Sequence, residues 1–160
     1  MSPLTIDDAT ERDVPLILSL IRELAEFEKL ASEVVATEES LRESLFGERR
    51  HAEVRVARYG GRPAGFALFF HNYSTFLGKP GLYLEDLFVR PELRGHGIGR
   101  ALLVDLARLA RERDCGRLEW WVLDWNESAI GFYGKLGAQP MGDWTVYRMN
   151  REAIDELAGD

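Results

Sequence analysis

Apolar residues along the chain recur first with the period of a helix and then with that of a strand. Between Val14 and Phe27 they return every three to four residues, which predicts a helix that opens after the polar segment Thr10–Asp13. A second helix is expected after Thr37, because two glutamates fill its first turn, where the helix dipole favours negative charge. Further helices are expected from Ile98, from Asn126 and at the C-terminus, with Gly137 ending the helix that Asn126 caps.

Short runs rich in β-branched and aromatic residues predict the strands between these helices. The expected strands are Leu4–Asp7, His51–Tyr59, Pro63–His71, Tyr83–Val89, Arg117–Leu123 and Thr145–Asn150. Gly60-Gly61 predicts a tight hairpin between the second and third of them. Strands and helices in this order indicate a mixed α/β fold, with a central sheet covered by helices on both faces. The length of 160 residues fits a single domain over residues 1–160.

Composition narrows the classes of function. The net charge is −7, which argues against a nucleic-acid partner. No apolar run is long enough to span a membrane, and the N-terminus does not resemble a secretion signal, so a cytoplasmic protein is expected. Cys115 is the one cysteine, which excludes an internal disulfide, and it is interpreted as a small core residue. The three histidines lack metal-ligand spacing, so no metal is expected.

The strongest chemical signal is a glycine-rich turn between a strand and a helix. The strand ends at Val89, and the segment Arg94–Gly99 (RGHGIG) leads into the next helix. Glycines let an anion approach the backbone closely, and the first N–H groups of a helix lack partners within the helix. The segment therefore predicts a phosphate-binding loop. It matches neither the P-loop nor the dinucleotide fingerprint.

This turn resembles the acyl-CoA loop of the GNAT acetyltransferase superfamily. More narrowly, the chain resembles the diamine (spermidine/spermine) N-acetyltransferases and their thialysine-acetylating relatives. The matching stretches are IRELAEFEK (21–29), TEESLRESLFG (37–47), YLEDLFV (83–89), RGHGIG (94–99) and WNESAIGFYGKLGA (125–138). The resemblance implies a GNAT fold whose mostly antiparallel sheet has about six or seven strands, acetyl-CoA as the acetyl donor, and a homodimer.

The resemblance also implies site residues. Those expected at acetyl-CoA are Leu87, Phe88, Val89, Arg94, Gly95, His96, Gly97, Ile98, Gly99, Arg100, Asn126, Ser128 and Tyr133. Those expected at the amine are Phe27, Glu28, Glu85, Trp120 and Trp121. Glu85 and Tyr133 are the expected catalytic pair, with the carboxylate accepting the ammonium proton, through water, and the phenol protonating the departing thiolate.

The residues taken alone also support plainer interpretations. Glu85 fits the polar face of a half-buried strand, and Tyr133 fits a packing aromatic. Asp86 follows Glu85 directly, so the two carboxylates would point to opposite faces unless a bulge intervened. Trp120 and Trp121 are likewise expected on opposite faces, one in the core and one at the substrate.

The expected reaction is direct attack by a primary amine on acetyl-CoA in a ternary complex. The acceptor stays open among polyamines, short diamines and thialysine. The segment Gln139–Asp143 is shorter than its counterpart in animal polyamine enzymes, which favours the shorter amines at least equally. Two other functions are alternatives: acetylation of a protein N-terminus or lysine, and non-catalytic binding of acyl-CoA.

Overall fold

The computed structural model describes residues 2–159, and the chain forms two compact units. The first is Met1–Trp121 and the second is Val122–Asp160. None of the described helices is long and apolar enough to cross a bilayer.

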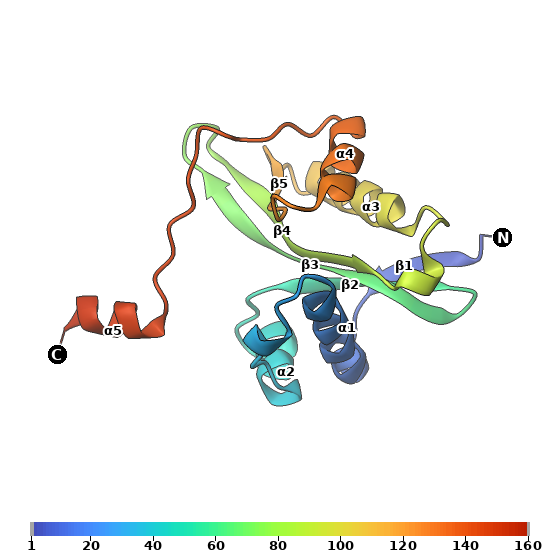
Figure 1. The fold of residues 1–160 in the computed structure, drawn as a ribbon, viewed down its shortest axis with the longest axis horizontal. Helices are drawn as coiled ribbons and strands as arrows, with labels where there is room; N and C mark the ends of the chain where they lie inside the picture. Colours follow the sequence, from blue (N-terminus) through green and yellow to red (C-terminus); the bar gives the residue numbers. More distant parts are fainter. Residues whose placement is uncertain (1, 160) are drawn as a thin grey trace. The chain divides into compact units, whose positions relative to one another are not determined.

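The first unit contains a five-stranded sheet with the order β1-β2-β3-β4-β5 (Figure 1). The strands are β1 (Leu4–Asp8), β2 (Glu53–Tyr59), β3 (Arg62–Ser74), β4 (Lys79–Val89) and β5 (Leu118–Trp120). Pairs along β1 to β4 are antiparallel, and β5 runs parallel to β4. The predicted hairpin is present, with positive φ at both Gly60 and Gly61.

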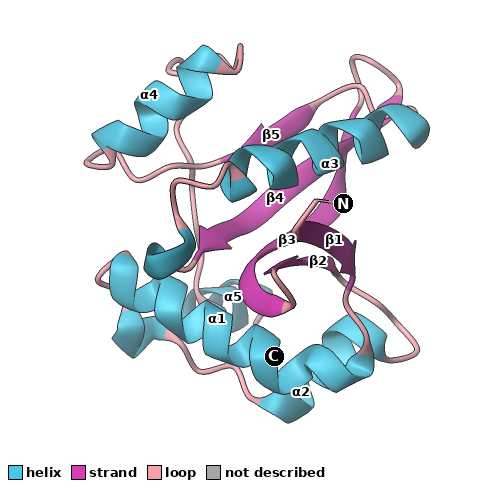
Figure 2. Cartoon of the chain, turned by 90° about the vertical axis from the view of Figure 1, so that its right-hand side faces the viewer, coloured by secondary structure: helices cyan, strands magenta, loops and turns pink. Residues whose placement is uncertain are grey.

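Helices cover both faces of this sheet, as the pattern of elements predicted. Helices α1 (Val14–Phe27) and α2 (Glu38–Phe46) lie on one face, called here the α1 face, and α3 (Ile98–Glu112) lies on the other (Figures 1 and 2). Three short 3-10 turns complete the unit: η1 (Glu11–Asp13), η2 (Ala31–Glu33) and η3 (Pro91–Leu93). The mixed α/β class is therefore confirmed.

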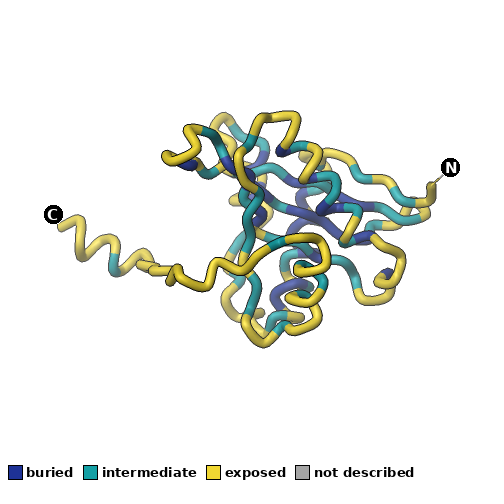
Figure 3. Tube along the Cα trace, turned by 90° about the horizontal axis from the view of Figure 1, so that it is seen from above, coloured by how far each residue is buried: buried dark blue, intermediate teal, exposed yellow. Residues whose placement is uncertain are grey.

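Polar side chains set where the first helices begin. At the start of η1, which leads directly into α1, the backbone N–H of Thr10 donates to Asp13 Oδ2 at 2.8 Å. At the start of α2, the N–H of Ser40 donates to Thr37 Oγ1 at 3.1 Å. These bonds satisfy donors that a helix leaves unpaired at its start. Behind them, Ile17 and Leu20 of α1 are fully buried, as is Phe66 of β3. Figure 3 shows this buried interior along the strands of the first unit.

The second unit contains α4 (Glu127–Lys135) and α5 (Arg151–Ala158). Asn126 caps α4 as predicted, its Oδ1 accepting from the N–H of Ala129 at 3.3 Å. Gly137 follows α4 with a φ of +91°, the left-handed conformation expected after a helix. Asn150 caps α5 in the same way, through the N–H of Ala153 at 2.9 Å.

The strand predicted at residues 145–150 is wrong, and the sheet has five strands rather than six or seven. Alternating apolar residues fit a strand, but a strand also needs a neighbour for its backbone hydrogen bonds. Within residues 2–159, no ladder includes residues 145–150, and Tyr147 is 92% exposed. The strand expected at Arg117–Leu123 is also shorter, ending at Trp120.

Candidate active site

A β-bulge in the middle of β4 decides how its acidic residues face. Leu84 pairs with Phe69 and Asp86 pairs with Leu68, so Glu85 is an extra residue that has no opposite number on β3. Leu68 packs against the core cluster that contains the α1 residues, so its pairing places Asp86 on the α1 face. Ordinary alternation from Leu84 places Glu85 there too. The bulge therefore sets two consecutive carboxylates on one face.

Other acidic and phenolic groups lie on the same face. Tyr83 pairs with Glu119 of β5, and Glu85 follows Tyr83 by two positions. Burial, together with the charges of Glu85 and Glu119, raises the pKa of Tyr83 to about 12. Glu28 lies at the C-terminal end of α1, and burial raises the pKa of its carboxyl. This part of the α1 face carries a concentration of negative charge.

Asp86 is the most strongly perturbed carboxyl group in this cluster. Burial, followed by the charges of Glu85 and Glu28, raises the pKa of Asp86 to about 7. Glu85 itself is exposed. The two neighbours therefore differ in surroundings, one largely withdrawn from water and the other open to it.

Aromatic rings border the carboxylates. Tyr83 packs against Phe70 with ring centroids 5.0 Å apart, and the ring of Trp121 meets Tyr83 edge-on at 6.0 Å. Trp120 pairs with Leu84 and so belongs to the opposite face of the sheet. Of the two predicted tryptophans, Trp121 is thus the one that lies on the side of Glu85.

The glycine-rich segment forms the turn into α3, as its sequence predicted. Gly95 and Gly97 have φ values of +89° and +75°, and a Cβ built on either would meet no atom within 4 Å. The loop backbone therefore faces open space, and a phosphate has room beside it. Gly97 directly precedes α3, whose first turn contains Ile98, Gly99 and Arg100 with their unpaired N–H groups. These residues fit the pyrophosphate of a CoA molecule.

Arg94 connects this loop to the first helix. Its guanidinium lies over the ring of Phe27 at 4.9 Å and near the ring of Phe88 at 5.9 Å. Its Nε donates to the carbonyl of Val89 at 3.1 Å. His96 points elsewhere, stacking on Tyr59 with ring centroids 4.5 Å apart.

The last residues of β4 form an open edge. Strand β5 pairs with β4 only from Leu82 to Leu84, whereas β3 pairs as far as Val89. The β5 side of Leu87, Phe88 and Val89 therefore carries no ladder in the described chain. An extended ligand could add to such an edge as a strand does.

Three of the expected site residues belong to the second unit. Asn126 and Ser128 lie at the start of α4, and Tyr133 lies in its last turn beside Phe132, with ring centroids 5.7 Å apart. Their relation to the loop and to Glu85 stays a prediction.

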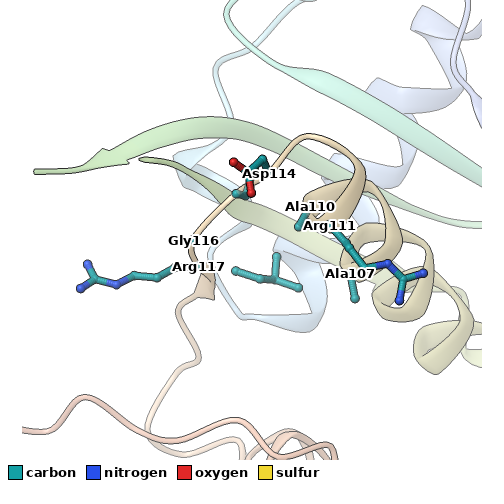
Figure 4. Close-up of a pocket in the computed structure, with 8 residues that line it drawn as sticks. Ala107, Ala110, Arg111, Asp114, Gly116 and Arg117 are labelled. Atoms are coloured by element: carbon teal, nitrogen blue, oxygen red, sulfur yellow. The ribbon is translucent and has the colours of Figure 1, made fainter. Parts of the chain in front are cut away.

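A hollow of about 340 Å³ at the end of α3 includes none of the expected site residues. In Figure 4, the side chains of Arg111 and Arg117 at its rim point in opposite directions, so they do not converge on one anion. Cys115 lines this hollow and is partly exposed, not a core residue as expected. Its Sγ lies 3.8 Å from His71 Nδ1, and burial raises the pKa of the thiol.

Sequence reasoning missed Asp86, Tyr83 and Glu119 as members of this site. The only available signal for Asp86 was its place next to Glu85, and alternation argued against it. The pairing of Glu119 with Tyr83 could not be read from the sequence, because it depends on the register of a parallel pair.

The chain is similar to known acetyltransferases in its sequence and to solved structures in its fold. Residues 18–138 match the Acetyltransferase (GNAT) family. The chain is 41% identical to a thialysine N-epsilon-acetyltransferase of Bos taurus over 99% of both chains. It is 34% identical to an L-ornithine N5-acetyltransferase of Arabidopsis thaliana, covering 93% of this chain and 85% of that one. Among solved structures, an integron cassette protein from the mobile metagenome of V. cholerae superposes over the full length of both chains with a TM-score of 0.83 at 26% identity.

Proposed function

Because the chain belongs to the GNAT family of acetyltransferases, we propose that it transfers the acetyl group of acetyl-CoA to the primary amine at the end of a small cationic molecule. Thialysine and ornithine are the acceptors named for two of its relatives. Both are α-amino acids whose side chain ends in an amine. We extend this class to the present chain, ahead of the longer polyamines.

The bulge in β4 is the observation that carries this proposal. It gathers Glu85 and Asp86 on the α1 face, near Glu28 and next to the aromatic rings of Tyr83 and Trp121. Several carboxylates in one place attract an ammonium group, and aromatic faces accommodate its aliphatic stem and its charge. A neutral or anionic acceptor would gain nothing from this arrangement.

The reaction needs a deprotonated amine. An alkyl ammonium has a pKa of about 10.4, so a carboxylate on the α1 face must take its proton before the nitrogen can attack. The free amine then attacks the thioester carbonyl directly, the C–N bond forms and the C–S bond breaks. No covalent acyl-enzyme is required, so both substrates are bound together.

The donor would lie along the residues that the resemblance indicated. The backbone of residues 94–100 holds the pyrophosphate, and the open edge of Leu87 to Val89 pairs with the pantetheine arm. Tyr133 protonates the departing thiolate, with Asn126 and Ser128 beside the arm. Phe27 supports this donor site through Arg94, and its expected place at the amine stays a prediction.

A panel of acceptors tests the proposal. CoA-thiol release from acetyl-CoA is followed with thialysine, ornithine, spermidine and a lysine-containing peptide. We expect thialysine and ornithine to give the highest kcat/KM. A preference for the peptide would transfer the function to protein acetylation, and no release with any acceptor, despite tight binding of acetyl-CoA, would indicate a non-catalytic protein.

A further inference from the structure

We propose that Asp86, rather than Glu85, takes the proton from the attacking amine, while Glu85 attracts and orients the cation. This assignment rests on the proposed acetyl transfer. It divides between two neighbouring residues the two tasks that the resemblance places on Glu85 alone.

The first support is the register of β4. Without the bulge, Asp86 would face α3 and could not reach a ligand bound beside Glu85. With it, Asp86 pairs with Leu68 and shares the α1 face with Glu85. The two carboxylates therefore lie on the same face of the sheet. Asp86 is half-buried there, and Glu85 is exposed.

The second support is the charge around Asp86. Half-buried carboxylates that serve structure here are paired with arginine: Asp105 Oδ2 lies 2.8 Å from Arg55 Nε, and Glu23 Oε2 lies 2.9 Å from an Arg90 guanidinium nitrogen. The charged groups acting on Asp86 are Glu85 and Glu28, and both are negative. Asp86 is half-buried, and no ion pair to it is found among residues 2–159. A partly desolvated carboxylate among negative charges costs stability, so its presence is better explained by function than by packing.

The third support is how close the pKa of the proton acceptor lies to the pKa of the proton donor. A base with a pKa of about 7 lies closer to an ammonium, at about 10.4, than a carboxylate of ordinary pKa near 4 does. The charged and titratable groups that act on Asp86 or on its neighbour Tyr83 are Glu28 from α1 and Glu85 and Glu119 from β4 and β5. Arg94, the cation that lies over Phe27 and Phe88 on this face, is not among the charges acting on Asp86. The β3 neighbour, Leu68, carries no charge.

The proton balance is complete. Ionised Asp86 takes one proton from the ammonium and becomes a carboxylic acid, leaving a neutral amine. The amine nitrogen bonds to the acetyl carbon and CoA leaves as a thiolate. The thiolate takes the proton of the Tyr133 hydroxyl, and the second nitrogen proton restores that hydroxyl. Asp86 returns its proton to water, so the products are the amide, CoA thiol and one proton.

A titration tests the assignment without any turnover. Carboxyl ¹³C chemical shifts are followed against pH in the full chain, and the Asp86 signal is identified by its loss in Asp86→Asn. We expect an apparent pKa near 7, and we expect ornithine, added without acetyl-CoA, to lower it by at least one unit. A pKa near 4, or one that ornithine leaves unchanged, overturns the proposal.

Kinetics of two variants provide the second test. Asp86→Asn should lower kcat by roughly 10²–10⁴-fold, leave amine KM within about threefold, and remove the acid limb of the kcat–pH profile. Glu85→Gln should raise amine KM and keep that limb. Asp86→Glu should restore part of kcat, and unchanged acetyl-CoA affinity by calorimetry shows that each variant is folded. The reverse pattern returns the proton acceptor to Glu85.

The proposed function and the assignment of Asp86 would fail in different experiments. If wild-type protein releases no thiol with any acceptor, the proposed function fails, and the titration with ornithine still decides whether Asp86 faces a cation site. If wild-type protein is active and Asp86→Asn keeps its rate and its pH profile, only the assignment of Asp86 fails.

Discussion

The guanidinium of Arg94 lies 4.9 Å from the centre of the Phe27 ring. This contact joins the end of α1 to the glycine-rich loop, two segments far apart in the sequence. Arg94 also donates to the carbonyl of Val89, so it is held from two directions. Phe27 thus orients a cation at the site expected to hold the CoA pyrophosphate.

Phe27→Leu should weaken CoA binding while leaving the fold intact. Leucine keeps the apolar volume and removes the ring face, and an exposed cation–π contact is worth about 0.5–1 kcal/mol, or about two- to fivefold in affinity. Calorimetric titration with CoA measures the change. Phe46→Leu is the matched control, because Phe46 also lies under an arginine, Arg50, outside the loop. Equal affinities in both variants would show that Phe27 has no part in donor binding.

Gly97→Val should lower CoA affinity at least tenfold, or by about 1.4 kcal/mol. The Cβ would enter the open space over the loop, and a branched residue also strains a backbone with φ of +75°. Gly78→Val separates these effects, because Gly78 has a φ of +64° and equally open surroundings at the β3–β4 turn. Calorimetry should show normal CoA affinity in that variant. Normal affinity in folded Gly97→Val would remove the phosphate from this loop.

The stability of Asp86→Asn should depend on pH. The folded protein binds more protons than the unfolded chain between pH 3.8 and about 7, because the pKa of Asp86 rises from its ordinary 3.8 to about 7. Wild-type stability therefore falls as pH rises through this window, and the asparagine variant escapes that loss. We expect it to exceed wild type by about 4 kcal/mol at pH 8 and by less than about 1 kcal/mol at pH 4.

Urea denaturation at the two pH values measures this difference. Glu156→Gln, at an exposed position of α5, is the control and should show no comparable change. A pH-independent difference for Asp86→Asn would mean that its carboxyl is not held in a desolvated, negative environment.

Tyr133→Phe should lower kcat by roughly 10²–10⁴-fold with little change in amine KM, because it removes the proposed donor and keeps the ring. A thioester with a more acidic thiol should restore part of the rate, since a better leaving group needs less protonation. Steady-state assays with acetyl-CoA and such an analogue measure both effects. A wild-type rate in the variant would leave Tyr133 as a packing residue on α4.

The protein should sediment as a homodimer, at about twice its 18.2 kDa, at micromolar concentration. The expectation comes from the family, and the exposed aromatic side chains of Trp144 and Tyr147 offer apolar area for an interface. Analytical ultracentrifugation over a range of concentrations is the measurement. A mass near 18 kDa throughout would contradict it.

Local signals were sufficient to predict most of the fold. The caps at Thr37 and Asn126, the stripe that ends at Phe27 and the two glycines of the β2–β3 hairpin each act within a few residues. Such effects can be recognised in one sequence. Local signals were insufficient at residues 145–150, because a strand depends on a partner edge that its own residues do not specify.

The parts of the site that a contiguous sequence motif specifies could be predicted, and the parts that depend on strand register could not. The glycine loop and Glu85 were recognised from contiguous residues. The placement of Asp86 depends on one unpaired residue opposite Leu68 and Phe69, and nothing in YLEDLFV announces that insertion. Simple alternation therefore places Asp86 on the face opposite Glu85, and only the bulge brings it to the same face.

The bulge has a consequence for protein engineering. Grafting the pair Glu-Asp onto an ordinary β-hairpin would divide the two carboxylates between its faces, however faithfully the neighbouring side chains were copied. A designer would have to copy the bulge itself, so that the strand carrying the pair has one more residue than the strand with which it pairs. Deleting Glu85 from the present chain should, by contrast, leave the pairs from Asp86 to Val89 in register, because it removes the extra residue and makes the ladder regular. Asp86 would stay on the α1 face, and only the neighbouring carboxylate would be lost.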